Sequence, residues 1–237
     1  MYGYRYGYGL GLDWTYLLLI IGMVLSLIAS AKMKSTFAKY KQIRSASGLT
    51  GAQTAERILR AAGIYDVRVV PIAGSLTDHY DPRSKQLALS QDVYDRASIA
   101  AVGVAAHECG HAIQHAQNYA PLNLRSAIVP AANIGANLAW PIFVAGLIFS
   151  LRPLLLAGII LFSLAVLFQL VTLPVELDAS SRALKMLRST GILGTDENKA
   201  ARKVLTAAAM TYVAALASSI LQLLRLLILA NGGRRRD

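Results

Sequence analysis

One segment of the chain has residue types and a spacing that suit metal chemistry: an H-E-x-x-H motif at residues 107–111. In a helix with 3.6 residues per turn, positions four apart share a face, so the imidazoles of His107 and His111 can hold one zinc ion. Glu108 lies one residue further round, where its carboxylate can reach a water on the metal without binding the metal itself. The motif therefore predicts hydrolysis of a peptide bond, with Glu108 as the general base.

The residues around the motif predict the helix that this chemistry requires. A five-residue pattern with three fixed positions occurs by chance in many helices, so its context decides what it means. Residues 97–106 are small and mostly apolar, and they follow the charged residues Asp92, Asp95 and Arg96. We expect one helix that begins near residue 97 and continues through His115.

A catalytic zinc usually has three protein ligands and one open position, so a third ligand must come from elsewhere in the chain. A metzincin would have glycine and histidine where this chain has Gln114 and Gln117, which excludes that class. His115 lies about 12 Å along the helix from His107, too far to share one ion. We expect His115 to be a surface or supporting residue.

Glu176 is the best candidate for the third ligand. It follows an apolar run, and Pro174 and the early acids predict that a helix begins there. Two predicted membrane crossings separate it from the motif, which returns Glu176 to the same side of the membrane. Asp178 either supports a ligand histidine or stabilises the start of that helix.

The composition predicts an integral membrane protein. The chain has 237 residues, 55% of them hydrophobic, and a formal net charge of +11. Four runs are long enough, and apolar enough, to approach the roughly 20 residues that cross a bilayer: 14–31, 128–151, 153–174 and 204–224, the last continuing past Arg225 to residue 230. Nucleic-acid binding would account for the charge but not for these runs, so we expect a lipid bilayer and no nucleic acid as a partner.

The distribution of basic residues predicts the topology. The first run is followed by a cluster of bases with no acid before Glu56: Lys32, Lys34, Lys39, Lys41 and Arg44. Positive charge after an apolar segment holds that end in the cytoplasm, which favours a retained anchor over a cleaved signal peptide. We therefore expect a multi-pass protein of the bacterial inner membrane with its active site on the cytoplasmic side. The C-terminal Arg234, Arg235 and Arg236 conflict with this topology.

This topology divides the chain into five parts. They are a membrane anchor at 14–31, a cytoplasmic metalloprotease lobe at 32–127, a transmembrane hairpin at 128–174, a cytoplasmic segment with the third ligand at 175–203, and a final membrane helix at 204–230. The fold class expected is mostly α, with about four transmembrane helices and a small α+β, zincin-like cytoplasmic lobe that carries the motif helix.

Within that lobe, the pattern predicts a helix at 50–62, a strand at 67–70 that Pro71 ends, and an extended segment at 86–90. The segment at 86–90 is either an edge strand to which a peptide substrate adds itself or part of an ordinary hairpin. Cys109 is the single cysteine, which excludes an intramolecular disulfide. It faces away from the zinc ligands, and we expect it to serve in packing.

Three segments resemble the YugP-type bacterial membrane zinc metallopeptidases: 76–82 with 87–90, 106–114, and 174–180. The resemblance implies a membrane-embedded zinc protease similar in organisation to HtpX-type enzymes. It also implies one catalytic Zn²⁺ held by His107, His111 and Glu176, with Glu108 as general base. HtpX-like proteases have an aspartate four residues after the glutamate ligand, whereas this chain has Ser180 there, so the residue that orients a ligand histidine stays open.

The function expected is a zinc metalloendopeptidase that cuts membrane or misfolded proteins in quality control or processing. The alternative is a non-catalytic membrane scaffold that keeps zinc for structure. An ion-coupled transporter is disfavoured because the membrane runs contain no acidic residue. His79 and Tyr80 either donate to the oxyanion or brace the turn, whereas Arg182 either stabilises the oxyanion or makes a phospholipid or surface contact. The sequence assigns neither the substrate nor the oligomeric state.

Overall fold

The computed structural model describes residues 13–231 and is mostly helical. Among these residues, four helices are long and apolar enough to cross a membrane: α1 (Tyr16–Lys41), α5 (Ala120–Ile148), α6 (Arg152–Ser189) and α7 (Thr195–Asn231). Four such helices were expected from the apolar runs. Two parts of the chain lie outside the described residues: the Tyr/Gly-rich start before residue 13 and the three arginines Arg234, Arg235 and Arg236.

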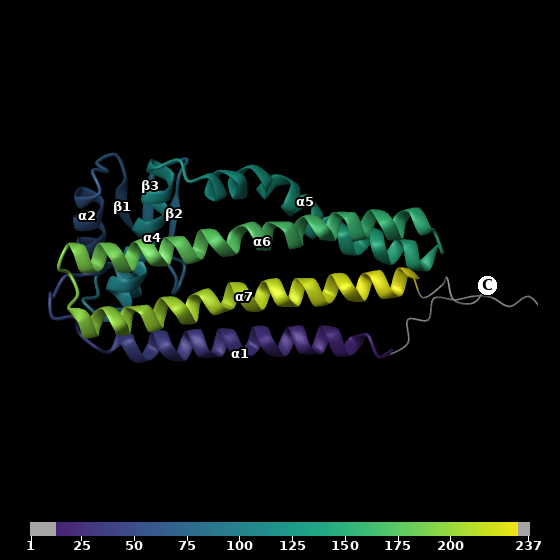
Figure 1. Ribbon diagram of the computed structural model, residues 1–237, viewed down its shortest axis with the longest axis horizontal. Coiled ribbons are helices and arrows are strands. Elements are labelled where there is room, and N and C mark those ends of the chain that lie inside the picture. The colour runs from purple at the N-terminus through teal and green to yellow at the C-terminus, as the bar shows by residue number, and fades with distance from the viewer. Residues whose placement is uncertain (1–12, 232–237) are drawn as a thin grey trace, which may run out of the picture. The chain divides into compact units, whose positions relative to one another are not determined.

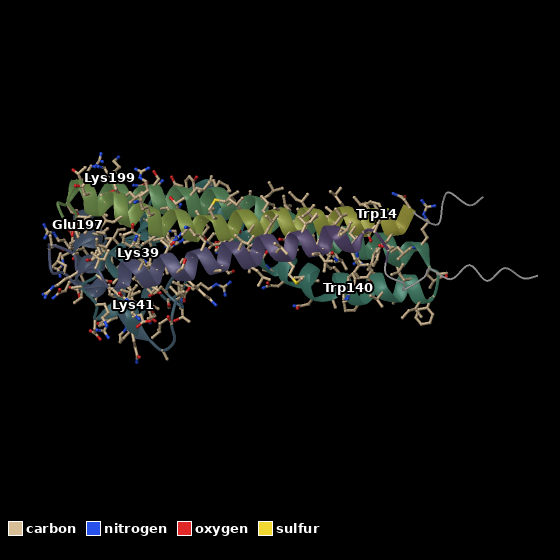
Figure 2. The ribbon with its side chains drawn as sticks, turned by 90° about the horizontal axis from the view of Figure 1, so that it is seen from below. Trp14, Lys39, Lys41, Trp140, Glu197 and Lys199 are labelled. Atoms are coloured by element: carbon tan, nitrogen blue, oxygen red, sulfur yellow. The ribbon has the colours of Figure 1, made fainter. Side chains whose placement is uncertain are left out.

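The chain forms two compact units, and the first consists of apolar helical segments. Its described part covers residues 13–28, 125–171 and 213–231. Within these residues the charged side chains are those of Asp13, Arg125, Arg152 and Arg225. Both tryptophans of the chain belong to this unit and are exposed, Trp14 by 63% and Trp140 by 48% (Figure 2). A surface this apolar suits a hydrocarbon environment.

The second unit covers residues 29–124 and 172–212 and contains all of the residues expected at the metal site. It comprises α2 (Gly51–Ala61), α3 (Gln91–Tyr94), α4 (Ile99–Ala116) and the strands β1 (Arg68–Ile72), β2 (His79–Asp81) and β3 (Gln86–Ser90). The C-terminal parts of α1 and α6 and the N-terminal part of α7 complete it (Figure 1). Lys39, Lys41, Glu197 and Lys199 are among its charged side chains (Figure 2).

The three strands form one small sheet in the order β1-β3-β2. β3 pairs in parallel with β1 and antiparallel with β2, so it is the central strand. Of the two alternatives for residues 86–90, the edge strand was therefore wrong and the hairpin, formed with β2, is the one found. The edges of the sheet are β1 and β2. β1 also continues through Pro71 to Ile72, because an edge strand has an open side where a missing N–H costs no ladder hydrogen bond.

Helix α4 carries the H-E-x-x-H motif and forms the centre of the core. It begins after Ser98, whose side chain accepts a hydrogen bond from the Ala101 amide at 3.2 Å. Its apolar face packs against α2 and is fully buried at Ala105 and Cys109. The helix predicted from residue 97 through His115 is confirmed. Cys109 serves packing as expected, and burial raises the pKa of its thiol well above the ordinary value.

Helix α6 runs without a break from Arg152 to Ser189, with Pro174 inside it. The prediction that a helix begins at Pro174 was wrong. The fixed φ of proline is compatible with a helix, and neighbouring packing can compensate for the hydrogen bond that proline cannot donate. Val175 and Ala179, just beyond the proline, are fully buried. Glu176 therefore projects from the interior of a long helix rather than from a first turn.

Candidate metal site

Two histidines of α4 and one glutamate of α6 converge in the second unit. The Nε2 atoms of His107 and His111 lie 3.2 Å and 3.5 Å from Oε2 of Glu176. All three potential ligand atoms lie within 4.8 Å of one another. The structure thus brings together the three residues that were expected to bind zinc.

The distances from the two histidines to Glu176 fit a zinc ion. Zinc binds nitrogen and oxygen at about 2.0–2.2 Å, and a tetrahedral site then places neighbouring ligand atoms roughly 3.3–3.5 Å apart. Both histidine-to-glutamate distances lie close to this range. The donor set of two imidazoles and one carboxylate is also one that catalytic zinc sites use, with a further position left for water.

Gln114 fixes the orientation of the His111 ring. Its amide nitrogen donates to the carbonyl oxygen of Val175 at 2.9 Å and to Asp178 Oδ2 at 2.7 Å. Both amide hydrogens are then used, so the amide oxygen faces His111 Nδ1 at 3.0 Å and must accept its proton. With the proton on Nδ1, the neutral ring presents the lone pair of Nε2 toward Glu176, as a metal ligand requires.

His107 is held by a different partner. Its Nδ1 lies 3.1 Å from the hydroxyl oxygen of Ser180, one turn beyond Glu176 on α6. Ser180 occupies the position where HtpX-like proteases carry an aspartate, so a hydroxyl here contacts the ligand ring. The rings of His107 and His111 meet edge to face with centroids 4.8 Å apart. Each histidine therefore has its own support, and both rings are restrained.

The electrostatics of the site favour a cation between these residues. The Glu176 side chain is only 3% exposed, and a buried carboxylate requires positive charge or hydrogen-bond donors nearby. Burial of the His111 ring opposes its charged form, but the hydrogen bond to Glu176 and the charge of Glu108 outweigh burial and raise the pKa of His111. Either a protonated histidine or a metal ion would supply the positive charge that the buried Glu176 carboxylate requires.

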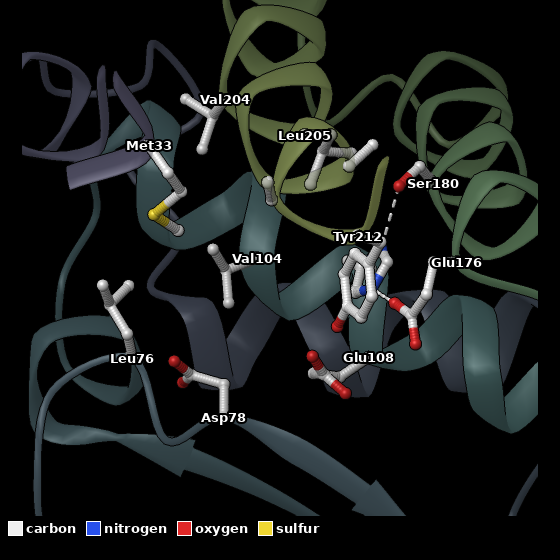
Figure 3. A pocket seen from close by; sticks show the side chains of 13 residues that line it. Met33, Leu76, Asp78, Val104, Glu108, Glu176, Ser180, Val204, Leu205 and Tyr212 are labelled. Atoms are coloured by element: carbon white, nitrogen blue, oxygen red, sulfur yellow. Dashed lines mark hydrogen bonds and ion pairs between the residues drawn. The ribbon is translucent and has the colours of Figure 1, made fainter. Parts of the chain in front are cut away.

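Glu108 lines a cavity of about 150 Å³ beside the cluster (Figure 3). It is 7% exposed and is not part of the three-residue metal cluster found among the described residues. His107, Glu176 and Ser180 line the same cavity, together with Tyr212 from α7. In the close-up, the hydroxyl end of Tyr212 points toward Glu108 (Figure 3). The base, two of the candidate ligands and a phenol thus share one small space.

The other candidates from the sequence lie outside this cavity. The Tyr80 hydroxyl bonds His115 Nδ1 at 2.9 Å and so ties β2 to α4, while His79 Nδ1 bonds the Thr77 carbonyl oxygen. Burial raises the pKa of Tyr80 to about 12, so this phenol stays protonated. These contacts brace the segment around β2, so of the two roles considered for His79 and Tyr80 the structure favours the bracing one. His115 has a supporting role, as expected.

Arg182 and Asp178 form an outer network. Arg182 donates to the Asp178 carboxylate and to the side-chain oxygen of Gln117, and its guanidinium lies over the Tyr119 ring. Asp178 therefore supports His111 through Gln114 and does not contact a histidine itself. Its second predicted role, at the start of a helix, is wrong because α6 begins far upstream.

Sequence reasoning missed the roles of Gln114 and Tyr212. Gln114 lies three residues after His111, a helical spacing that places the two side chains on one face, so its position was a usable signal. Tyr212 belongs to a helix far along the chain, and no motif marks it.

Comparison with known proteins agrees with this geometry. The family model described as "Putative neutral zinc metallopeptidase" matches residues 15–231. The chain belongs to this zinc metallopeptidase family. The chain is also 48% identical, over 217 residues, to the Bacillus subtilis (strain 168) protein named "Putative membrane protease YugP", a match that covers 92% of this chain and 96% of that protein. No solved structure matches the chain significantly.

Membership in the neutral zinc metallopeptidase family confirms the resemblance drawn from the three sequence segments. The match spans all four apolar helices and both units. A family of zinc peptidases and a site with a zinc-type donor set thus indicate the same metal.

Proposed function

We propose that this protein is a membrane-embedded zinc metalloendopeptidase that uses Glu108 as its general base. The observation that carries the proposal is the convergence of His107, His111 and Glu176 beside a cavity that Glu108 lines. Two histidines and one glutamate hold the zinc in this assignment. The non-catalytic scaffold would need the same three ligands but would have no use for Glu108 in an accessible cavity.

When bound, zinc supplies a Lewis acid that polarises the peptide carbonyl and makes water acidic enough to lose a proton near neutral pH. Glu108 accepts this proton as the water oxygen attacks the carbonyl carbon. The protonated Glu108 then delivers the proton to the amide nitrogen, which leaves as an amine when the C–N bond breaks. Glu108 ends the cycle ionised, as it began.

Tyr212 is assigned as the donor to the substrate oxygen that gains negative charge. Two hydroxyl side chains line the cavity, Ser180 and Tyr212. Ser180 contacts the ligand ring of His107, whereas the phenol of Tyr212 is directed toward Glu108 (Figure 3). A preorganised donor near the attacked carbonyl stabilises the transition state more than the ground state. His79, Tyr80 and Arg182 are each engaged elsewhere.

Charge and hydropathy support a location in the bacterial inner membrane. Four helices are apolar enough to cross a bilayer, and the bases that follow the first apolar run favour a metal site on the cytoplasmic side. Substrates would then be membrane or misfolded proteins whose loops or ends reach the cytoplasmic surface. A role in membrane protein quality control or processing is consistent with this position.

Replacement of Glu108 by glutamine tests the proposal. Glutamine keeps the size of the side chain but cannot accept the proton, so cleavage of an unfolded, casein-like protein should fall by about 10²–10⁴-fold. The zinc content of the purified full-length chain should stay at one ion, because Glu108 is not a ligand. Full cleavage by Glu108→Gln would disprove the mechanism. An inactive wild type that holds one zinc ion would support the scaffold instead.

A further inference from the structure

The cavity beside Glu108 has an apolar part that the proposed mechanism does not use. Seven apolar residues line it: Met33, Leu76, Val104, Val204, Leu205, Ala208 and Ala209. They come from α1, the segment before β2, α4 and α7. Figure 3 shows Met33 and Val104 on one side of the cavity and Glu176 and Ser180 on the other. An apolar wall therefore continues directly from the polar site.

The size of the cavity limits what it can hold. The whole cavity, with its polar part included, has a volume of about 150 Å³. A cavity of about that volume holds a molecule the size of benzene. The apolar part therefore has room for at most one side chain of the size of leucine or phenylalanine. Two alanines, Ala208 and Ala209, keep this part open, since larger side chains on α7 would fill it.

The charges around the cavity oppose an acidic occupant. Among residues 13–231, its lining includes three carboxylates, Asp78, Glu108 and Glu176, and no lysine or arginine. Asp78 is the one carboxylate on the apolar side, and Ser90 donates to it from its amide at 2.7 Å and from its hydroxyl at 3.0 Å. Burial raises the pKa of Asp78, because partial removal from water disfavours its charged form.

We infer that this apolar part is a specificity pocket for a leucine- or phenylalanine-sized side chain next to the bond that is cut. The inference rests on the proposed function, and it names the substrate class of that site: extended peptide segments with a medium-sized apolar residue at the cleavage position. Apolar pockets of this kind discriminate by about 10–200-fold between side chains that differ by a methylene or two.

Peptide binding to the Glu108→Gln protein measures the preference without turnover. The full-length, zinc-loaded variant in detergent is titrated with short glycine/serine peptides that carry one varied residue: alanine, leucine, phenylalanine, lysine or aspartate. Only the varied side chain can enter the pocket. We expect leucine and phenylalanine peptides to bind at least 10-fold more tightly than the other three. Equal affinities would overturn the inference, and so would tightest binding of the lysine peptide, which would indicate pairing with Asp78.

Ala208→Phe fills the pocket and should abolish the advantage of the leucine and phenylalanine peptides. Met210→Phe is the matched control, because Met210 lies on the same helix, is 48% exposed and does not line the cavity. It should leave the preference unchanged. Zinc content and melting temperature report whether each variant is folded, and Ala208→Leu is a milder substitute if Ala208→Phe does not fold. An unchanged preference in a folded Ala208 variant would contradict the inference.

Cleavage of the same peptides by the wild type separates the two proposals. Cleavage that depends on Glu108 but ignores the varied residue would refute the pocket and leave the peptidase intact. Selective binding with no cleavage by the wild type would refute the peptidase and leave an apolar side-chain site. Both the peptidase and the pocket would be supported if the wild type cleaves next to leucine or phenylalanine, and if this selectivity is lost in Ala208→Phe but kept in Met210→Phe.

Discussion

Gly110 of α4 lies directly against the backbone carbonyl of Ala179 on α6. A Cβ atom built at Gly110 would lie 2.4 Å from that carbonyl oxygen, a distance that real Cβ atoms do not adopt. Glycine at this position therefore lets the two helices approach closely. His111 and Glu176 lie one and three residues from this contact, so the close approach is what brings the candidate ligands within reach of one ion.

Gly110→Ala should push α4 and α6 apart. Overpacking of a well-packed contact costs about 1–3 kcal/mol, and here the displaced atoms belong to backbone. We expect a lower melting temperature and zinc affinity reduced by at least 10-fold, measured by thermal unfolding and by competition with a chromophoric chelator.

Gly103→Ala is the matched control in the same helix. A Cβ atom there would lie 3.5 Å from the Ala201 side chain, which is ordinary van der Waals contact. Alanine is favoured over glycine inside a helix by about 0.5–1 kcal/mol, so this change should be neutral or stabilising. A Gly110→Ala protein that binds zinc as well as Gly103→Ala would contradict the account of the contact.

Removal of zinc should destabilise the fold, because the proposed ligands of the ion lie on both α4 and α6. A ligand at 100 times its dissociation constant stabilises by about 2.7 kcal/mol, which corresponds to roughly 5–10 °C in melting temperature for a chain of this size. Treatment of the wild type with a chelator should lower the melting temperature by that amount. Glu176→Ala should lack most of this shift and most of the bound zinc. Glu56→Ala, at a solvent-exposed helical pair, should retain both.

Gln114→Ala should weaken zinc binding without removing a ligand. The variant loses the group that accepts the His111 Nδ1 proton, so the ring is free to rotate and to change tautomer. Loss of such a supporting contact typically reduces metal affinity by about 10–100-fold. Gln117→Ala is the control, since the Gln117 side chain accepts from Arg182, whereas that of Gln114 faces the His111 ring. Equal zinc affinity in the two variants would show that Gln114 does not orient the ligand.

Tyr212→Phe should lower kcat and leave zinc content and KM nearly unchanged. The phenol is proposed to donate to the substrate oxygen only as it gains charge, and removal of one such donor costs about 10²–10³-fold in kcat. Steady-state cleavage of a fluorogenic peptide measures both constants. A rise in KM at constant kcat would instead place Tyr212 in substrate binding, and loss of zinc would place it in the structure of the metal site.

The features predicted correctly from the sequence depend on residues near one another in the chain. The His107–His111 spacing and the small apolar residues before it predict the α4 helix because helical periodicity is a local property. The four apolar helices follow in the same way from continuous hydropathy. Glu176 was selected by counting membrane crossings, by resemblance to a family and by a local helix start that proved wrong. The structure places it beside both histidines.

Only the tertiary structure decided the contacts between distant segments. Three pairs of neighbouring side chains come from helices that are far apart in sequence: Ser180 and His107, Gln114 and Asp178, and Tyr212 and Glu108. The central place of β3 depends on strand pairing, and the passage of α6 through Pro174 depends on packing around Val175 and Ala179. Local pattern specifies the residues that can bind a metal, whereas close packing of separate helices decides which side chains hold those residues in place.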